Sequence, residues 1–169
     1  MTAVDRVVHY QEHVSSKSYD ELVAAFEAGV ADGREEFVRL FQEASSSENS
    51  RQVWESGMNN AVGPAGFLYV FKVDFGQVLG WYGVSAKAKT WIYGHPSIAA
   101  AMGREDVRVG GRVPLQILIY EGGDGVARIG YDLPSSVFGW LGNAAVDAVA
   151  RELDRKVVGF VTEIAGVSA

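Results

Sequence analysis

Hydrophobic and polar positions follow a helical period in the first part of the chain and a strand-like period from about residue 66 onward. In "SSKSYDELVAAFEAGVADG", Leu22, Phe26 and Val30 recur at helical spacing and form one apolar stripe. Ser18 followed by Glu21 has the spacing of a capping box. The pattern therefore predicts a helix that begins directly after Ser18.

One strand and two more helices complete the first part of the chain. Residues 4–14 alternate as in a strand, and one face of that strand would hold Val8, Tyr10, Glu12 and Val14. Residues 34–44, "REEFVRLFQEA", have helical spacing, and so does the segment that begins with "RQVWES". Residues near 34–60 therefore form an extra helical segment.

Residues 66–94 predict two strands. "GFLYVFKVDF" alternates without interruption, which would place on one face Phe67, Tyr69, Phe71, Val73 and Phe75. "KAKTWIYG" reads as the next strand, with Lys87, Lys89, Trp91 and Tyr93 on one face. Such aromatic and β-branched runs are typical of strands that are partly buried.

The stretch "VPLQILIYEGGDGVARIGYD" predicts a hairpin, because two β-rich runs flank a glycine-rich loop. We expect Glu121 to pair with Val126 across this loop. That register would bring together Gln116 with Tyr131, Leu118 with Ile129, and Tyr120 with Ala127.

The pattern as a whole predicts an α+β fold. A long amphipathic helix closes the chain, with Asn143 as its N-cap. We expect a single domain, residues 1–169, in which a mainly antiparallel sheet of four to five strands packs against helices. Both faces of the hairpin are apolar, so the surplus face needs a partner subunit, a ligand or the extra helical segment as its cover.

Composition narrows the classes of function. The net charge of −6 and the absence of a basic cluster argue against nucleic acid as a partner. Cysteine is absent, which excludes disulfides and thiolate metal sites. No apolar run approaches the roughly 20 residues of a membrane span. We therefore expect a cytoplasmic protein with no membrane or nucleic-acid partner and no cofactor.

The spacing of the histidines does not predict a metal site. His9 and His13 have the spacing of a helical zinc motif, but in a strand they would lie about 13 Å apart. No metal site is therefore expected. His95 stands between Gly94 and Pro96 in "WIYGHPSIAAAMG", where Pro96 is suited to open a helix. We favour a local role at this corner for His95, with a pocket contact or general-base catalysis as alternatives.

Four acidic residues lie near predicted strand ends. Asp124 is explained by the hairpin turn, Glu121 by a cross-strand pair with Arg128, and Asp132 by a hydrogen bond at the following "LPSS" corner. Asp74 has no such explanation, which leaves it as a candidate polar anchor.

Three stretches together resemble the domain of unknown function 302 family: "YGHPSIAAAM", "VPLQILIYEGGDGVARIGYDLPSS" and "AVARELDRKVVGFV". The resemblance covers residues 66–163. It implies a β-α-β4-α fold like that of the TATA-binding protein, often seen as a dimer, and it implies no established activity. In two positions this sequence departs from the family pattern, because His95 replaces an asparagine and Phe75 replaces a histidine.

Three functions remain open. The first hypothesis is a small-molecule-binding domain, a homodimer, whose pocket between sheet and helices takes an apolar or aromatic molecule. Its lining would be Trp91, Tyr93, His95, Gln116, Tyr120 and Tyr131, with Asp74 and Glu121 as polar anchors. The second is a cofactor-independent enzyme that uses His95 or Glu121 as its base. The third is a structural domain whose aromatic face is a dimer interface.

Overall fold

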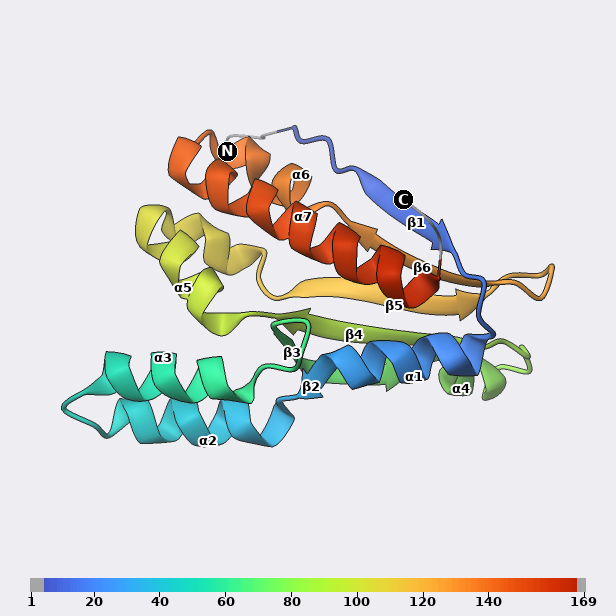
Figure 1. Cartoon of the computed structure of the whole chain (residues 1–169), viewed down its shortest axis with the longest axis horizontal. Coiled ribbons are helices and arrows are strands. Elements are labelled where there is room, and N and C mark those ends of the chain that lie inside the picture. Colours follow the sequence, from blue (N-terminus) through green and yellow to red (C-terminus); the bar gives the residue numbers. More distant parts are fainter. Residues whose placement is uncertain (1–4, 167–169) are drawn as a thin grey trace.

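A six-stranded sheet with the order β1-β6-β5-β4-β3-β2 forms the framework of the protein (Figure 1). The computed structural model describes residues 5–166. The strands are β1 (Tyr10–Val14), β2 (Val30–Asp32), β3 (Phe67–Asp74), β4 (Ala88–Gly94), β5 (Leu115–Glu121) and β6 (Ala127–Asp132). β2 runs parallel to β3, whereas the other neighbouring pairs are antiparallel.

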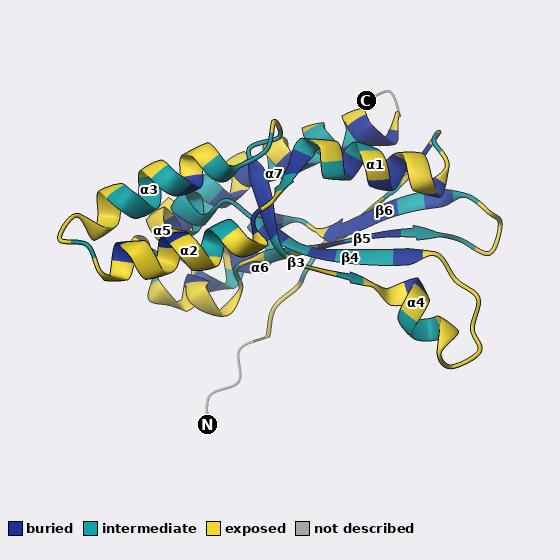
Figure 2. Ribbon diagram, turned by 90° about the horizontal axis from the view of Figure 1, so that it is seen from below, coloured by how far each residue is buried: buried dark blue, intermediate teal, exposed yellow. Residues whose placement is uncertain are grey.

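Helices flank this sheet on several sides. They are α1 (Tyr19–Gly29), α2 (Arg34–Ser45), α3 (Ser50–Ala61), α4 (Phe75–Gly80), α5 (Pro96–Glu105), α6 (Pro134–Phe138) and α7 (Ala144–Ala165), with short 3-10 helices at Val107–Gly111 and Gly139–Leu141. Helices α1 and α7 lie over one face of the sheet, while α4 lies below the strands (Figure 2). Helices α2 and α3 form a hairpin beside α5 (Figure 1).

The helix starts follow from the sequence. Ser18 and Glu21 form the expected capping box at the start of α1. The side chain of Asn143 accepts hydrogen bonds from the backbone amides of Ala145 and Val146, which begins α7. Pro96 opens α5, where its missing N–H costs nothing. These three predictions are confirmed.

The sheet is larger than the expected four to five strands, and it is mixed. The missed strand, β2, has three residues and follows α1 directly, so "GVADG" looks like a helix end rather than a strand. β1 begins at Tyr10, and residues 5–9 are not in a strand, which shortens the first predicted strand. Residue 4 lies outside the described residues.

A β-bulge breaks the alternation predicted for β3. Tyr69 pairs with Tyr93, but Phe71 pairs with Ile92, so one extra residue lies between the two pairs. Tyr69 therefore packs against the helices, whereas Phe71 lies on the opposite face with 54% of its surface exposed. The predicted shared face of these aromatic residues is wrong, and Phe75 begins α4 instead of extending the strand.

The β5–β6 hairpin is shifted by one residue from the predicted register. Glu121 pairs with Ala127, not with Val126. Gly125 has a positive φ of 76°, and the amide of Gly122 donates to the carbonyl of Val126, so the loop takes in Val126. Tyr131 consequently faces Ile117 instead of Gln116, as the one-residue shift requires.

Two hydrophobic clusters hold the fold together. The larger fills the space between the sheet and helices α1 and α7, and includes Phe26, Trp91 and Val161. The smaller consists of Leu40, Met58 and Leu68, so it joins the α2–α3 hairpin to β3. Among the described helices, none is long and apolar enough to cross a membrane.

Candidate functional site

An apolar cavity of about 260 Å³ lies where β4 ends and β5 begins. Five helices and the sheet contribute to its wall. Representative lining residues are Phe37 of α2, Trp54 of α3, Val70 of β3, Met102 of α5, Phe138 of α6 and Leu153 of α7. Because these elements come from the whole length of the chain, the cavity exists only in the assembled fold.

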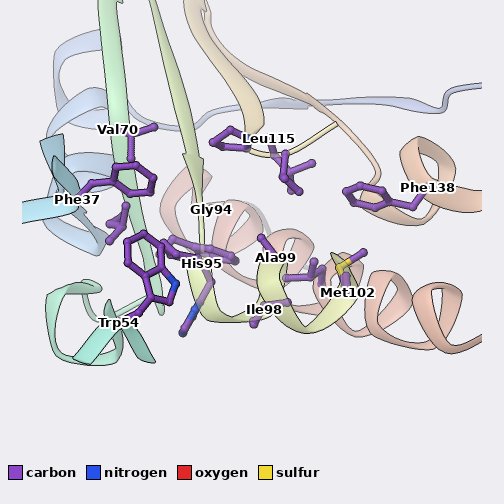
Figure 3. A pocket seen from close by; sticks show the side chains of 16 residues that line it. Phe37, Trp54, Val70, Gly94, His95, Ile98, Ala99, Met102, Leu115 and Phe138 are labelled. Atoms are coloured by element: carbon purple, nitrogen blue, oxygen red, sulfur yellow. The ribbon is translucent and has the colours of Figure 1, made fainter. Parts of the chain in front are cut away.

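The cavity lies along the border between the two hydrophobic clusters. Phe37 and Trp54, which pack on the smaller cluster, lie on one side, and Met102 and Phe138 of the larger cluster lie on the other (Figure 3). Gly94, His95 and Ala99 lie between them, at the β4–α5 corner. The α2–α3 hairpin therefore forms one wall of the cavity.

His95 is the titratable residue of this lining. It is the residue between β4 and Pro96, in an extended conformation, and its side chain makes no capping hydrogen bond. Its Nδ1 atom is buried and has no hydrogen-bond partner among the described residues. Burial, and then the positive charge of Lys156, lower the pKa of His95, which favours the neutral imidazole.

Three aromatic residues expected in the pocket lie in the larger cluster instead. Trp91, Tyr93 and Tyr131 are 0%, 1% and 2% exposed, and none of them lines the cavity. Their side chains point to the face covered by α1 and α7, because the strand register and the bulge direct them there. Burial raises the pKa of Tyr131 to about 12, as expected for a core phenol.

Gln116 and Tyr120 lie on the other face of β5. Gln116 is exposed, and neither residue lines the cavity. The hydroxyl of Tyr120 donates a hydrogen bond of 2.6 Å to Glu12 on β1. This bond, together with burial, raises the pKa of Tyr120 to about 12. The contact links two strands that are not neighbours in the sheet.

Asp74 and Glu121 make local contacts away from the cavity. Asp74 accepts a hydrogen bond from the backbone amide of Gln77 and so caps α4. Glu121 pairs with Lys87 at 2.9 Å, not with Arg128 as expected. Arg128 pairs instead with Asp124 at 2.7 Å, because the shifted hairpin register brings it towards the turn.

The corner after β6 is held by a residue that the sequence analysis did not identify for this role. The amide of Ser135 donates to the Oδ1 atom of Asp154 on α7 at 2.9 Å. Asp132, the residue expected there, is exposed and pairs with Tyr10 in the sheet. The carboxylate comes from a distant helix, so no local pattern could identify it.

Of the residues that line the cavity, the sequence patterns had indicated only His95 as a site residue. Phe37 and Trp54 are apolar positions on helices that look ordinary in sequence, and they meet through an edge-to-face contact with 5.3 Å between ring centres. Their apolar stripes could have been read as one side of a helical hairpin. Only the fold shows that this hairpin faces the β4–α5 corner.

Metal ligands do not gather in the described part of the chain. Residues 5–166 contain no group of three or more His, Asp or Glu side chains placed to hold an ion. His13 instead stacks against Tyr131, with its Nε2 atom 3.3 Å from the phenol oxygen.

Comparison with known proteins identifies relatives of undefined activity. Residues 41–164 match the family model DUF302, described as a domain of unknown function. The structure is also similar to the crystal structure of an uncharacterized conserved DUF302 protein from Bacillus stearothermophilus, with a TM-score of 0.63 and 16% sequence identity. That likeness covers 92% of this chain and 97% of the other and concerns the fold. No curated protein matches the chain.

Proposed function

This chain belongs to the DUF302 family, a domain of unknown function, and we propose that it binds a small hydrophobic molecule in the cavity beside His95. The cavity itself carries this proposal. Its volume of about 260 Å³ exceeds the roughly 150 Å³ that is enough to hold benzene in an apolar protein interior. A mostly apolar wall with few polar groups is typical of a small-molecule site.

The arrangement supports binding more than general-base catalysis. A catalytic histidine needs a second group that orients it, and none of the described residues that line the cavity carries a carboxylate or hydroxyl. Glu121, the other candidate base, lies at the far end of β5 from Leu115, which lines the cavity. Along a strand that separation amounts to about 20 Å.

Filling the cavity tests this proposal. We expect indole to bind the wild-type protein and the variant Ala99→Trp to lose that binding, because Ala99 lines the cavity and the new side chain would occupy it. The measurement is saturation-transfer NMR of indole, supported by the ligand-dependent rise in melting temperature.

Ala100→Trp is the matched control, because Ala100 lies on the same helix but is exposed. Indole should bind this variant as it binds the wild type. Equal binding to all three proteins, or none to the wild type, would overturn the proposed site.

An interaction between two copies of the chain is a second candidate, and it is compatible with the first. The sheet face opposite α1 and α7 exposes Tyr10, Val14 and Phe71 at 53%, 51% and 54%. Tyr10 and Val14 lie on β1 and Phe71 lies on β3 of the same sheet, and α4 covers only one end of that face (Figure 2). Apolar groups gathered on one face are typical of a symmetric interface.

A further inference from the structure

We propose that the α4 tip, defined as residues 75–86, binds the surface of a lipid bilayer, with Trp81 and Tyr82 among the headgroups of zwitterionic lipids. This inference does not depend on the cavity and concerns a different part of the molecule. It rests on the exposure of the two aromatic side chains, on the absence of charge around them, and on a backbone that is hydrogen-bonded within the turn.

The α4 tip holds large aromatic side chains in solvent. Trp81 and Tyr82 are 74% and 79% exposed, and Phe75 and Val84 of the same segment are exposed as well. Figure 2 shows that α4 and the turn after it project below one end of the sheet, away from the helices that cover the opposite face. Exposed apolar groups that gather in one place mark contact with a protein or a membrane.

Charge is absent from the α4 tip. Its sequence, "FGQVLGWYGVSA", contains no charged residue, although 21% of the residues of the chain are charged. The nearest charged residues along the chain are Asp74 and Lys87, at the base of the tip. Each has a partner of opposite charge, because Asp74 lies 4.0 Å from Lys89 and Lys87 lies 2.9 Å from Glu121. The tip can therefore leave water without the desolvation of a charge.

The backbone of the turn forms hydrogen bonds within the tip. The amides of Tyr82 and Val84 both donate to the carbonyl of Leu79, at 2.9 and 3.1 Å. Gly83 allows this closed turn, because its φ of 78° is a conformation that other residues rarely adopt. Lipid offers no partners for free backbone groups. A turn that bonds its own amides therefore suits a lipid surface better than an open loop would.

The residue types and the charge of the chain indicate the kind of lipid. Tryptophan and tyrosine are enriched where membranes meet water, because each ring has an apolar body and a polar atom. The net charge of −6 opposes an anionic surface, so zwitterionic lipids fit this chain better. The expectation of no membrane partner rests on the length of the apolar runs, and contact with a bilayer surface needs no membrane span.

Flotation of the full chain with phosphatidylcholine vesicles tests the inference. We expect the wild type to float with the vesicles, and added salt to leave this binding unchanged, because apolar groups carry it. Trp81→Ser should weaken the binding about tenfold, as expected when one large apolar side chain no longer leaves water. Val107→Ser is the matched control, because Val107 is 85% exposed and lies outside the tip. This variant should bind as the wild type does.

Tryptophan fluorescence provides an independent measurement. All four tryptophans lie within residues 5–166, and of these only Trp81 is exposed. Its emission should therefore shift to shorter wavelength when the vesicles are added. Trp81→Phe keeps an aromatic ring at this position, so it should retain the binding but lose the shift.

Several results would overturn the bilayer contact. They are a wild type that does not float with phosphatidylcholine vesicles, equal binding by Trp81→Ser, and binding to anionic phosphatidylglycerol vesicles alone. A spectral shift that persists in Trp81→Phe would also contradict it. A wild type that stays off the vesicles, but forms a dimer that Trp81→Ser dissociates, would overturn the inference and assign the α4 tip to a second copy of the chain.

Discussion

The side chain of His95 couples protonation to folding. Because burial and Lys156 lower its pKa in the folded protein, the unfolded chain binds more protons between that lowered value and the ordinary value of about 6.5. The free energy of unfolding should therefore fall as the pH drops from 7 through this window. In His95→Gln the fall should be smaller, as measured by urea denaturation at several pH values.

His9→Gln is the control for the loss of one imidazole, because His9 is exposed. A His95→Gln variant with the same pH dependence as the wild type would contradict the assigned surroundings of His95.

The surroundings of single residues could be predicted from the sequence only in part. The local motif around Pro96 correctly indicated that His95 stands at a strand-to-helix corner. It could not show which of the aromatic residues share a cavity with this histidine. Trp91 and Trp54 look equally suited to a pocket in sequence, yet only Trp54 lines it. Their difference depends on contacts between elements far apart in the chain.

Gly57 and Gly159 both lie in helices, but only at Gly57 would an added Cβ meet closely packed atoms. In α3 a Cβ at Gly57 would lie 2.3 Å from Cδ2 of the buried Leu40, whereas a Cβ at Gly159 of α7 meets nothing within 4 Å. Gly159→Ala should therefore stabilise the protein by about 0.5–1 kcal/mol. Gly57→Ala should destabilise it, by about 1–3 kcal/mol, because overpacking outweighs the gain in propensity.

Chemical denaturation of both variants measures these changes. Stabilisation by Gly57→Ala would mean that the α2–α3 hairpin does not pack on Leu40 as described.

Secondary structure was largely predictable where a local signal exists. The capping box of α1, the Asn143 cap and the helices α2 and α3 all follow from residue patterns. The β3 bulge and the hairpin register were not predictable in this way, since each adds one residue to a strand or loop without a distinctive sequence. Because side chains alternate along a strand, each shift moved aromatic residues to the other face.

The open face of the sheet leads to a prediction about the assembly of the whole protein. If two copies pair through this face, Phe71→Asp should yield a monomer under conditions in which the wild type is a dimer, because it places a charge in an apolar interface. Val107→Asp is the control, since Val107 is 85% exposed and lies in the 3-10 helix after α5. Sedimentation velocity distinguishes the two states.

A monomeric wild type across the concentration range would contradict this interface. The α+β class itself did follow from the pattern, because the helical and the strand-like periods can each be recognised in the sequence. The assembly does not follow from it, since the same apolar face fits a partner, a ligand or a helix.

The position of the cavity between two hydrophobic clusters has a consequence for motion. The α2–α3 hairpin packs on β3 through the smaller cluster, which has Leu40, Met58 and Leu68 at its centre. A molecule in the cavity would touch this cluster and the larger one together and so act as a bridge between them. Occupancy would then hold the hairpin more firmly against the rest of the fold and slow any local opening of it.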